Sequence, residues 1–376
     1  MNPDFWKNKK VFLTGHTGFK GGWSVMWLKS FGAVVTGYSL EPPSRPSLFE
    51  SARISEGIRS VTGDLRDFRR LKQCMEETRP DVVIHMAAQP LVRESYRDPI
   101  GTYATNVLGT VHLLEAVRQL PDPPVVINVT TDKCYENREW VWGYRENEPL
   151  GGADPYSSSK ACSEIVTSAY RDSYFHANDR SGRGVALATC RAGNVIGGGD
   201  WAEDRLVPDV LRALMEGREP VIRNPNSTRP WQHVLDPLNG YFLLIEKLFE
   251  NRKNYAEAWN FGPDEDVGKP VSWIVERLSA FWGKKIAWVK DLQNNPHEAR
   301  FLKLNCSKAK ERLGWRPKLG VEKALQWTAD WFKAYAEGSD MRFWSESQIR
   351  EFMGTVDAPS RAGESPALKE EHVPCL

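Results

Sequence analysis

The sequence predicts an α/β fold in which a doubly wound parallel sheet is joined to a smaller mixed α/β lobe. Two observations predict it. Short apolar runs rich in β-forming residues alternate with helical segments as far as residue 191, and beyond that point the elements become shorter and mixed. The chain has 376 residues, 41% of them hydrophobic, which is enough to bury the cores of two lobes. We expect a first domain over 1–191, to which later segments return, a second lobe over 192–340, and a flexible polar tail over 357–376.

The first strand and the turn after it form the clearest motif. Val11–Leu13 is a short apolar run, and glycines follow it at Gly15, Gly18 and Gly21. Glycine adopts turn angles that a Cβ forbids, lets a pyrophosphate approach the backbone, and lets a helix pack closely on a strand. A helix expected over 19–31 would direct its N-terminal N–H groups at that phosphate. The glycines alone fit an ordinary turn equally well. The strand before them and the helix after them favour a Rossmann-type dinucleotide site.

The next strands follow in order, and the second of them bears on the choice of cofactor. An acidic residue at its end favours NAD, whereas arginine favours NADP. This strand ends at Ser39, with Glu41 two residues later and Arg45 beyond two prolines, so the sequence favours NAD. Further strands are expected before Gly63, at 82–89, at 125–130 and at 185–190.

The fifth strand is followed by the residues that carry chemistry. Thr131, Asp132 and Lys133 stand at its carboxyl end, where open α/β sheets build their sites. Tyr156 and Lys160 are four residues apart on the next predicted helix, so they share one face. We expect the ammonium to lower the pKa of the tyrosine, whose phenolate would take a hydroxyl proton while hydride leaves the same carbon. Such a pair is common on helix surfaces, and its place after the fifth strand favours catalysis.

Together these motifs resemble the extended short-chain dehydrogenase/reductase family, in its sugar-nucleotide branch, from about residue 10 to residue 336. The resemblance implies that NAD is the cofactor of the first domain and that Asp64 contacts its adenine, although an aspartate there could equally be a helix N-cap. The cofactor-binding residues that it implies are Gly15, Thr17, Gly18, Phe19, Gly21, Ser39, Asp64, Leu65, Ala87, Ala88, Gln89, Asn106 and Thr130.

Asp132 and Lys133 narrow the resemblance to the 4,6-dehydratases of that branch. In these lyases the sugar is oxidised at C4, water is eliminated across C5 and C6, and the hydride returns to C6. Asp132 would protonate the leaving hydroxyl, and Lys133 stands where most members have the glutamate that removes the C5 proton. Thr131–Tyr135 is similar to the CDP-glucose branch, which implies CDP-glucose as the substrate and a place in deoxysugar biosynthesis for O-antigen or lipopolysaccharide. The alternative for Asp132 and Lys133 is a solvated loop pair.

A second group of residues is expected on the substrate side, in the nucleotide-sugar lobe. Asn194 follows the sixth strand, and the resemblance implies that it contacts the substrate phosphates. Arginine suits a diphosphate because its fork donates two parallel hydrogen bonds, although any single arginine is more often a surface residue. The implied substrate-binding residues are Arg93, Asn194, Arg205, Arg229, His233 and His297.

Composition excludes several other functions. A net charge of +1 gives no electrostatic case for nucleic acid or an anionic membrane. The seven histidines and six cysteines show no metal-binding spacing, so we expect no metal. The chain shows no signal peptide or membrane span, and unpaired cysteines fit the cytoplasm. The resemblance further implies a homodimer, or a dimer of dimers, that pairs the helices near 100–118 and 155–177.

Three other functions share most of these motifs. A nucleotide-sugar 4-epimerase would need Tyr156 and Lys160 but neither Asp132 nor Lys133. A net dehydrogenase would release reduced cofactor. A non-catalytic NAD(P)-sensing regulator would keep only the fold, and the presence of both Tyr156 and Lys160 disfavours it.

Overall fold

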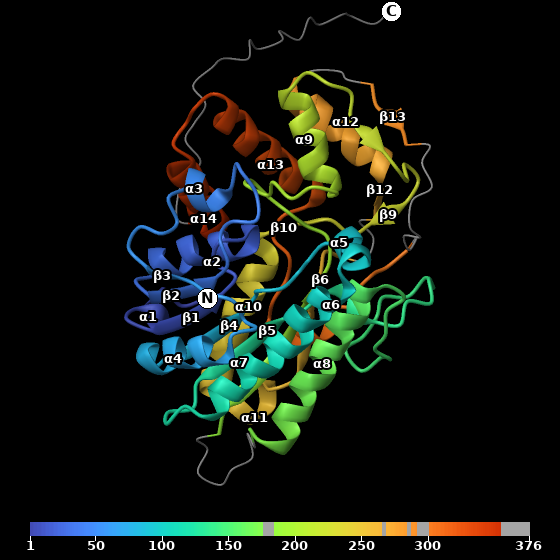
Figure 1. Ribbon diagram of the computed structural model, residues 1–376. Coiled ribbons are helices and arrows are strands. Elements are labelled where there is room, and N and C mark those ends of the chain that lie inside the picture. The colour runs from blue at the N-terminus through green and yellow to red at the C-terminus, as the bar shows by residue number, and fades with distance from the viewer. Residues whose placement is uncertain (176–183, 265–267, 284–286, 292–300, 355–376) are drawn as a thin grey trace, which may run out of the picture.

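A seven-stranded sheet forms the centre of the computed structural model, which describes residues 1–175, 184–264, 268–283, 287–291 and 301–354 (Figure 1). Its strand order is β11-β6-β5-β4-β1-β2-β3, and all neighbours run parallel. The order reverses between β1 and β4, the place where open α/β sheets bind ligands. The predicted fold class is therefore confirmed. The strands are Lys10–Thr14 (β1), Val34–Ser39 (β2), Arg59–Thr62 (β3), Val82–His85 (β4), Val125–Val129 (β5), Ala186–Ala192 (β6) and Ala258–Phe261 (β11).

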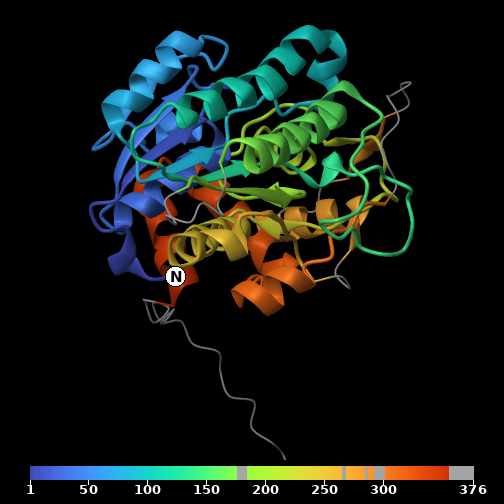
Figure 2. The same cartoon turned by 90° about the horizontal axis from the view of Figure 1, so that it is seen from below.

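Helices cover both faces of this sheet, which explains why its central strands are apolar throughout. Val11 and Leu13 of β1 pack into the core formed with α2 and α10, whereas Phe12 packs into the core formed with α4 and α7. Figure 2 shows α7 and α8, in cyan and green, on one side of the sheet and α10, in yellow, on the other. The first layer is Phe68–Thr78 (α4), Val92–Arg97 (α5), Pro99–Tyr103 (α6), Ala104–Leu108 (η1), Gly109–Arg118 (α7) and Pro155–Ser173 (α8). The second layer is Phe19–Ser30 (α2), Leu235–Glu250 (α10) and Met341–Met353 (α14).

The smaller lobe lies beyond the carboxyl ends of the strands, and its described residues form three helices and three two-stranded ribbons (Figure 1). Its helices are Leu206–Met215 (α9), Val271–Trp282 (α12) and Val321–Ala336 (α13). Its ribbons pair Val195–Ile196 (β7) with Gln232–His233 (β10), Thr228–Arg229 (β9) with Lys269–Pro270 (β12), and Val221–Ile222 (β8) with Val289–Lys290 (β13). Short helical turns complete the fold at Pro3–Trp6 (α1), Leu48–Ser51 (α3), Asp132–Cys134 (η2), Arg252–Tyr255 (α11) and Ala309–Leu313 (η4).

Three elements differ from the sequence-based expectations. The strand at 258–261, expected among the mixed elements of the second lobe, instead pairs with β6 as the edge strand of the main sheet. The helix expected over 100–118 contains a π-helical stretch, η1, which turns Asn106 inward. The helix expected over 155–177 ends at Ser173. The tail expected over 357–376 lies outside the described residues.

Asp236, in the first turn of α10, is a carboxyl buried in the core. It is fully buried and accepts hydrogen bonds from the backbone N–H groups of Lys318, at 2.6 Å, and Leu319, at 3.3 Å. Burial raises the pKa of Asp236 to about 7 against the effect of these two bonds. Because the folded chain then holds a proton that the unfolded chain releases near pH 4, stability falls as the pH rises between about 4 and about 7.

We predict that Asp236→Asn flattens this pH dependence. At about 1.4 kcal/mol for each pKa unit, the linkage lowers the wild-type free energy of unfolding by up to about 4 kcal/mol over that range. Asparagine cannot ionise, so the variant should lose far less stability between about pH 5 and about pH 8. Urea denaturation of both proteins at the two pH values measures the difference. Parallel pH curves for the two proteins would contradict the prediction.

None of the described helices is long and apolar enough to cross a membrane. Within the same residues, no group of three or more histidine, cysteine, aspartate or glutamate side chains is arranged to hold a metal ion.

Candidate active site

The glycine turn lies where the sequence predicts it, at the point where the strand order reverses. Gly15 has a φ of 81°, and a Cβ there would come within 2.8 Å of the backbone nitrogen of Ala87. A Cβ on Gly21 would come within 2.0 Å of the Gly15 carbonyl oxygen, so only glycine lets α2 begin this close to β1. At the N-cap, Gly18, a Cβ would touch nothing closer than 3.4 Å, and no side chain caps the helix. This cradle suits a diphosphate at the positive end of α2.

Two side chains of this turn were not singled out from the sequence. The ring of His16 is buried and lies over Gly37, its Nε2 is 2.7 Å from Ser60 Oγ, and burial lowers its pKa to about 4. Lys20 points toward the carboxyl ends of the strands, where burial and the charges of Arg205 and Lys160 lower its pKa to about 8. The sequence signal for Lys20 was only a cation inside an otherwise apolar helix start.

The residues expected around the adenosine half of the cofactor gather at the ends of β2 and β3. Thr17 Oγ1 lies 2.9 Å from Ser39 Oγ and donates to the Leu40 carbonyl. The Asp64 carboxylate accepts from the side chain and backbone N–H of Arg66, and the Arg66 side chain holds the pKa of Asp64 below its usual range. Leu65 is buried beside them.

Ala87, Ala88 and Gln89 follow β4 and complete the other wall of the crevice. The amides of Met86 and Ala87 donate to Thr14 Oγ1, whose own proton can go to His85 Nδ1 at 2.8 Å. Asn106 holds the next turn, because it accepts from Gln89 N–H at 2.8 Å and donates to the Gln89 carbonyl at 3.1 Å.

Several side-chain hydrogen bonds join helix α8 to the end of β5. Asn128 donates to Ser163 and Thr167, and Lys160 Nζ donates to the Val129 carbonyl at 3.2 Å. Asn106 Nδ2 also donates to Ser159 Oγ at 2.9 Å, which ties α8 to the cofactor crevice. The chain then turns through Thr131–Cys134, so Tyr156 and Lys160 lie beside the turn that carries Asp132 and Lys133. The sequence-predicted catalytic residues are thus brought together.

The electrostatics of the tyrosine–lysine pair differ from the expectation. Burial raises the pKa of Tyr156 to about 12, and a hydrogen bond with Thr131 and the charge of Arg205 lower it only in part. The expectation that Lys160 lowers this pKa is therefore wrong for the protein alone, because the desolvation of a phenolate outweighs the charges nearby. Burial also lowers the pKa of Lys160 to about 8, against the opposing charge of Glu164.

Asp132 is buried in a space that only a glycine opposite it can leave open. A Cβ on Gly193, just after β6, would come within 2.1 Å of Asp132 Oδ2. Burial raises the pKa of Asp132, while Lys133, a 3.0 Å hydrogen bond from Thr131 Oγ1 and the charge of Arg229 oppose the shift. A carboxyl with a raised pKa keeps its proton to higher pH and can act as an acid. This arrangement favours a catalytic role for Asp132 over the alternative that it is a solvated loop residue.

A cavity opens directly beside Asp132 toward the smaller lobe. It is lined by Asp132 and Gly193 from the sheet and by residues of the lobe, namely Thr228, Pro230, Gly262, Pro263, Asp264, Gly268, Phe301, Leu302, Lys303 and Leu304. The Phe301–Leu304 lining comes from a segment that was not singled out from the sequence.

Five of the six residues expected on the substrate side divide into three groups. Arg229 and Arg205 reach the site, since their charges act on Asp132 and Tyr156 respectively, and Arg205 is held by Asp200 at 2.9 Å. Arg93, on α5, pairs with Asp204 at 3.2 Å, and Asn194 is half-buried between β6 and β7. His297 lies outside the described residues.

His233 is a correction. It is fully buried, with its ring against the edges of Trp23 and Trp327, at centroid distances of 6.0 and 5.5 Å. Burial lowers the pKa of His233 to about 3, so it is a neutral core residue rather than a substrate contact.

The site thus combines a dinucleotide cradle, a tyrosine beside a lysine, and a buried carboxyl with a raised pKa at one end of a sheet. A proton acceptor, a proton donor and an amine at the same end of the sheet can support proton transfers at neighbouring carbons of a bound sugar.

Comparison with known proteins gives matches over nearly the whole chain. A family model described as GDP-mannose 4,6 dehydratase matches residues 12–328. The chain is 52% identical to the CDP-glucose 4,6-dehydratase of Salmonella typhimurium, over 95% of this chain and 99% of the relative. It is 28% identical to a dTDP-glucose 4,6-dehydratase of Xanthomonas campestris pv. campestris, over 85% and 92%. A solved structure, the Thermus thermophilus UDP-glucose 4-epimerase in complex with NAD, matches with a TM-score of 0.74 and 26% identity, over 86% of this chain and 98% of that one.

Proposed function

The chain belongs to the GDP-mannose 4,6-dehydratase family, within the extended short-chain dehydrogenase/reductases, and we propose that it is a lyase that converts CDP-glucose to CDP-4-keto-6-deoxyglucose and water. The observation that carries the proposal is the buried Asp132, whose pKa is raised, beside Tyr156 and Lys160. An epimerase has no need of such an acid. The 52% identity to a CDP-glucose 4,6-dehydratase supports the choice of nucleotide.

NAD is the cofactor, and the glycine cradle fits it, because Gly15 and Gly21 let α2 begin close to β1, where its N-terminal N–H groups suit a diphosphate. The turn from Gly15 to Gly21 would hold the diphosphate, Ser39, Asp64 and Leu65 the adenosine, and Ala87–Gln89 with Thr130 the nicotinamide half. Bound there, NAD would supply reversible hydride chemistry at C4 and C6, with no net oxidation or reduction.

The side chains of the protein carry out the proton transfers. Tyr156 Oη accepts the proton of the C4 hydroxyl, and Thr131 hydrogen-bonds the same substrate oxygen. The C4 ketone acidifies the C5 proton, which Lys133 removes. Asp132 gives its proton to the C6 hydroxyl, which leaves as water. Lys133 gives a proton back to C5 when the hydride returns to C6. Exchange with solvent then removes the proton that Tyr156 took and replaces the one that Asp132 gave.

The substrate diphosphate needs cations on the lobe side of the cavity. Arg229 and Arg205 are proposed for this role, because arginine donates in pairs to phosphate oxygens. Arg93 and Asn194 would contact the same region from the edge of the site. Both arginines lie close enough to the reacting groups to act on their charges.

Lys133→Met should abolish exchange of the C5 proton with solvent. Methionine fills a similar volume but has no lone pair to take a proton, so we expect exchange to fall by about 10²-fold or more. Nuclear magnetic resonance in deuterated water measures deuterium entering C5. Retained exchange would show that Lys133 is not the base. Lys133→Arg serves as a control, because arginine keeps the positive charge but does not accept a proton.

We further propose that the protein assembles as a homodimer, or as a dimer of such dimers. Ile100, Leu108 and Ile165 are 82%, 54% and 57% exposed on α6, η1 and α8, which a hydrogen bond between Tyr103 and Ser158 joins. Large apolar side chains on neighbouring helices favour a second copy as the cover. Light scattering gives the molar mass, and a monomer would contradict this.

The proposed location is the cytoplasm. The five cysteines among the described residues are all free thiols, as a reducing compartment allows.

Mass spectrometry of CDP-glucose incubated with the protein and NAD tests the proposed function. Loss of one water without accumulation of reduced cofactor is the expected result. An isomer of unchanged mass would indicate an epimerase, accumulated reduced cofactor a dehydrogenase, and no conversion of any nucleotide sugar a non-catalytic NAD-binding protein.

A further inference from the structure

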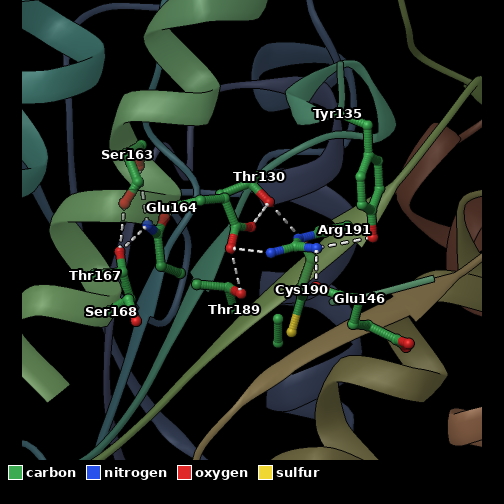
Figure 3. A network of polar contacts seen from close by, with 12 residues as sticks. Thr130, Tyr135, Glu146, Ser163, Glu164, Thr167, Ser168, Thr189, Cys190 and Arg191 are labelled. Carbon is green, nitrogen blue, oxygen red and sulfur yellow. Dashed lines mark hydrogen bonds and ion pairs between the residues drawn. The ribbon is translucent and has the colours of Figure 1, made fainter. Parts of the chain in front are cut away.

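Directly behind the turn at residues 131–134 lies a buried ion pair that the proposed mechanism does not use. Glu164, one helical turn after Lys160 on α8, accepts from Arg191 of β6 at 2.8 Å (Figure 3). The two side chains are only 3% and 4% exposed. Burial opposes the charge of Arg191, but the Glu164 carboxylate outweighs it and holds the pKa of Arg191 above its ordinary value. Both groups are therefore charged.

The pair binds both ends of the turn. On the incoming side, Thr130 donates its hydroxyl proton to Glu164 Oε1. On the outgoing side, Arg191 Nη1 donates to the Tyr135 hydroxyl at 2.8 Å, and its guanidinium lies 4.9 Å from the centre of the Tyr135 ring. Figure 3 shows Thr130 and Tyr135 reaching the pair from opposite sides. One ion pair thus holds the residue before Thr131 and the residue after Cys134.

Stability by itself does not account for such a pair. Desolvation of two buried charges consumes most of their mutual attraction, and apolar residues of the same size often stabilise a fold as well or better. An ion pair instead fixes the geometry of its neighbours, because each hydrogen bond to it requires one particular arrangement of donor and acceptor.

We propose that Glu164 and Arg191 are positioning residues that hold the 131–134 turn against α8, so that Asp132 and Lys133 face the same substrate as Tyr156 and Lys160. The catalytic consequence rests on the proposed function, whereas the positioning itself does not. Lys160 supports the arrangement, because its bond to the Val129 carbonyl holds the strand one residue earlier.

Cys134 provides a probe of the turn that needs neither substrate nor cofactor. Its thiol is fully buried within the turn, and a buried thiol reacts with iodoacetamide only when its surroundings open. Cys74, on α4, and Cys306, whose thiol donates to the Gly262 carbonyl just after β11, are buried elsewhere and report on the whole fold. Cys162 is half-buried and confirms that the reagent is active.

The decisive comparison is Thr130→Val against Thr189→Val. Both threonines donate to Glu164, and both changes remove one hydroxyl at nearly constant volume, but Thr189 lies on β6 and does not connect to the turn. Peptide mass spectrometry after labelling gives the rate at each cysteine. We expect Thr130→Val to speed the labelling of Cys134 by about tenfold, the effect of losing one hydrogen bond to a charged acceptor, and Thr189→Val to leave it nearly unchanged.

Three results would overturn the proposal. Unchanged labelling of Cys134 in Thr130→Val would show that the bond does not hold the turn. Equal increases in both variants would show that Glu164 supports the sheet in general. Parallel increases at Cys74 and Cys306 would show that the whole fold had loosened.

Tyr135→Phe tests the catalytic consequence from the other end of the turn. Asp132 and Lys133 act after Tyr156 has accepted its proton, so loosening the turn should lower kcat with little change in KM and should let reduced nicotinamide accumulate during turnover. Equal slowing of every step would overturn the positioning of Asp132 and Lys133. A wild-type protein inactive on CDP-glucose would instead refute the proposed function and leave the labelling results standing.

Discussion

Replacing Tyr156 with phenylalanine should lower kcat for CDP-glucose by about 10³-fold or more, because no other described group can take the C4 proton from the same position. The hydroxyl is the only atom group lost, and the ring keeps its packing against the turn. Tyr156 is 8% exposed and its pKa is raised to about 12 by burial, so substrate and cofactor must bind before proton transfer becomes favourable.

A steady-state assay of product formation measures this effect. Tyr170→Phe is the matched control, since it removes a hydroxyl from the same helix away from the site and should retain most activity. Thermal unfolding of both variants checks that the fold is kept. Activity of Tyr156→Phe above about a tenth of wild type would show that another group accepts the proton.

Asp132→Asn should slow the loss of water by about 10²- to 10⁴-fold while C4 oxidation continues. Asparagine preserves the shape of the side chain facing Gly193 but has no acidic proton to give to the leaving hydroxyl. Because oxidation depends on Tyr156 and Lys160 and elimination on Asp132, reduced nicotinamide should accumulate with the variant and not with the wild type.

Stopped-flow absorbance of reduced nicotinamide, together with mass analysis of the products, measures both halves of the reaction. Asp172→Asn on the exposed end of α8 removes a carboxylate away from the site and should behave as wild type. If Asp132→Asn keeps full activity and yields an isomer of the substrate, the protein is an epimerase.

The rate of elimination by the wild-type protein should depend on pH through the ionisation of Asp132. Burial raises the pKa of Asp132, so the carboxyl keeps its proton to a higher pH than a solvated aspartate would. The elimination step should therefore lose rate as the pH rises through that pKa.

Much of the fold could be predicted because its signals are local. The glycines at Gly15, Gly18 and Gly21 sit within one turn, and the strands at Val34–Ser39 and Val125–Val129 are short apolar runs with clear ends. Tyr156 and Lys160 share a helix face because of their spacing alone. The edge strand Ala258–Phe261 could not be assigned in this way, since an apolar run does not specify which strand it will join.

For the site, the sequence indicated which residues to expect better than it indicated their burial and their pKa values. The sequence placed Asp132 at a strand end, but only the fold brings Gly193 within reach of its carboxylate and so buries it. Lys20 and the Glu164–Arg191 pair were missed, because their roles depend on neighbours from distant segments. His233 was misassigned because its motif does not reveal that Trp23 and Trp327 enclose it.

By itself, then, the sequence determined the α/β class and the dinucleotide turn, which follow from patterns along one segment, and it predicted the proton-transferring side chains from spacing and from resemblance. Only the tertiary structure decided which of those side chains are charged, which are buried and which face one another. The physical reason is that desolvation and Coulomb interactions depend on everything within several ångströms, whatever its distance along the chain. The raised pKa of Tyr156, one helical turn from a lysine expected to lower it, is the clearest instance.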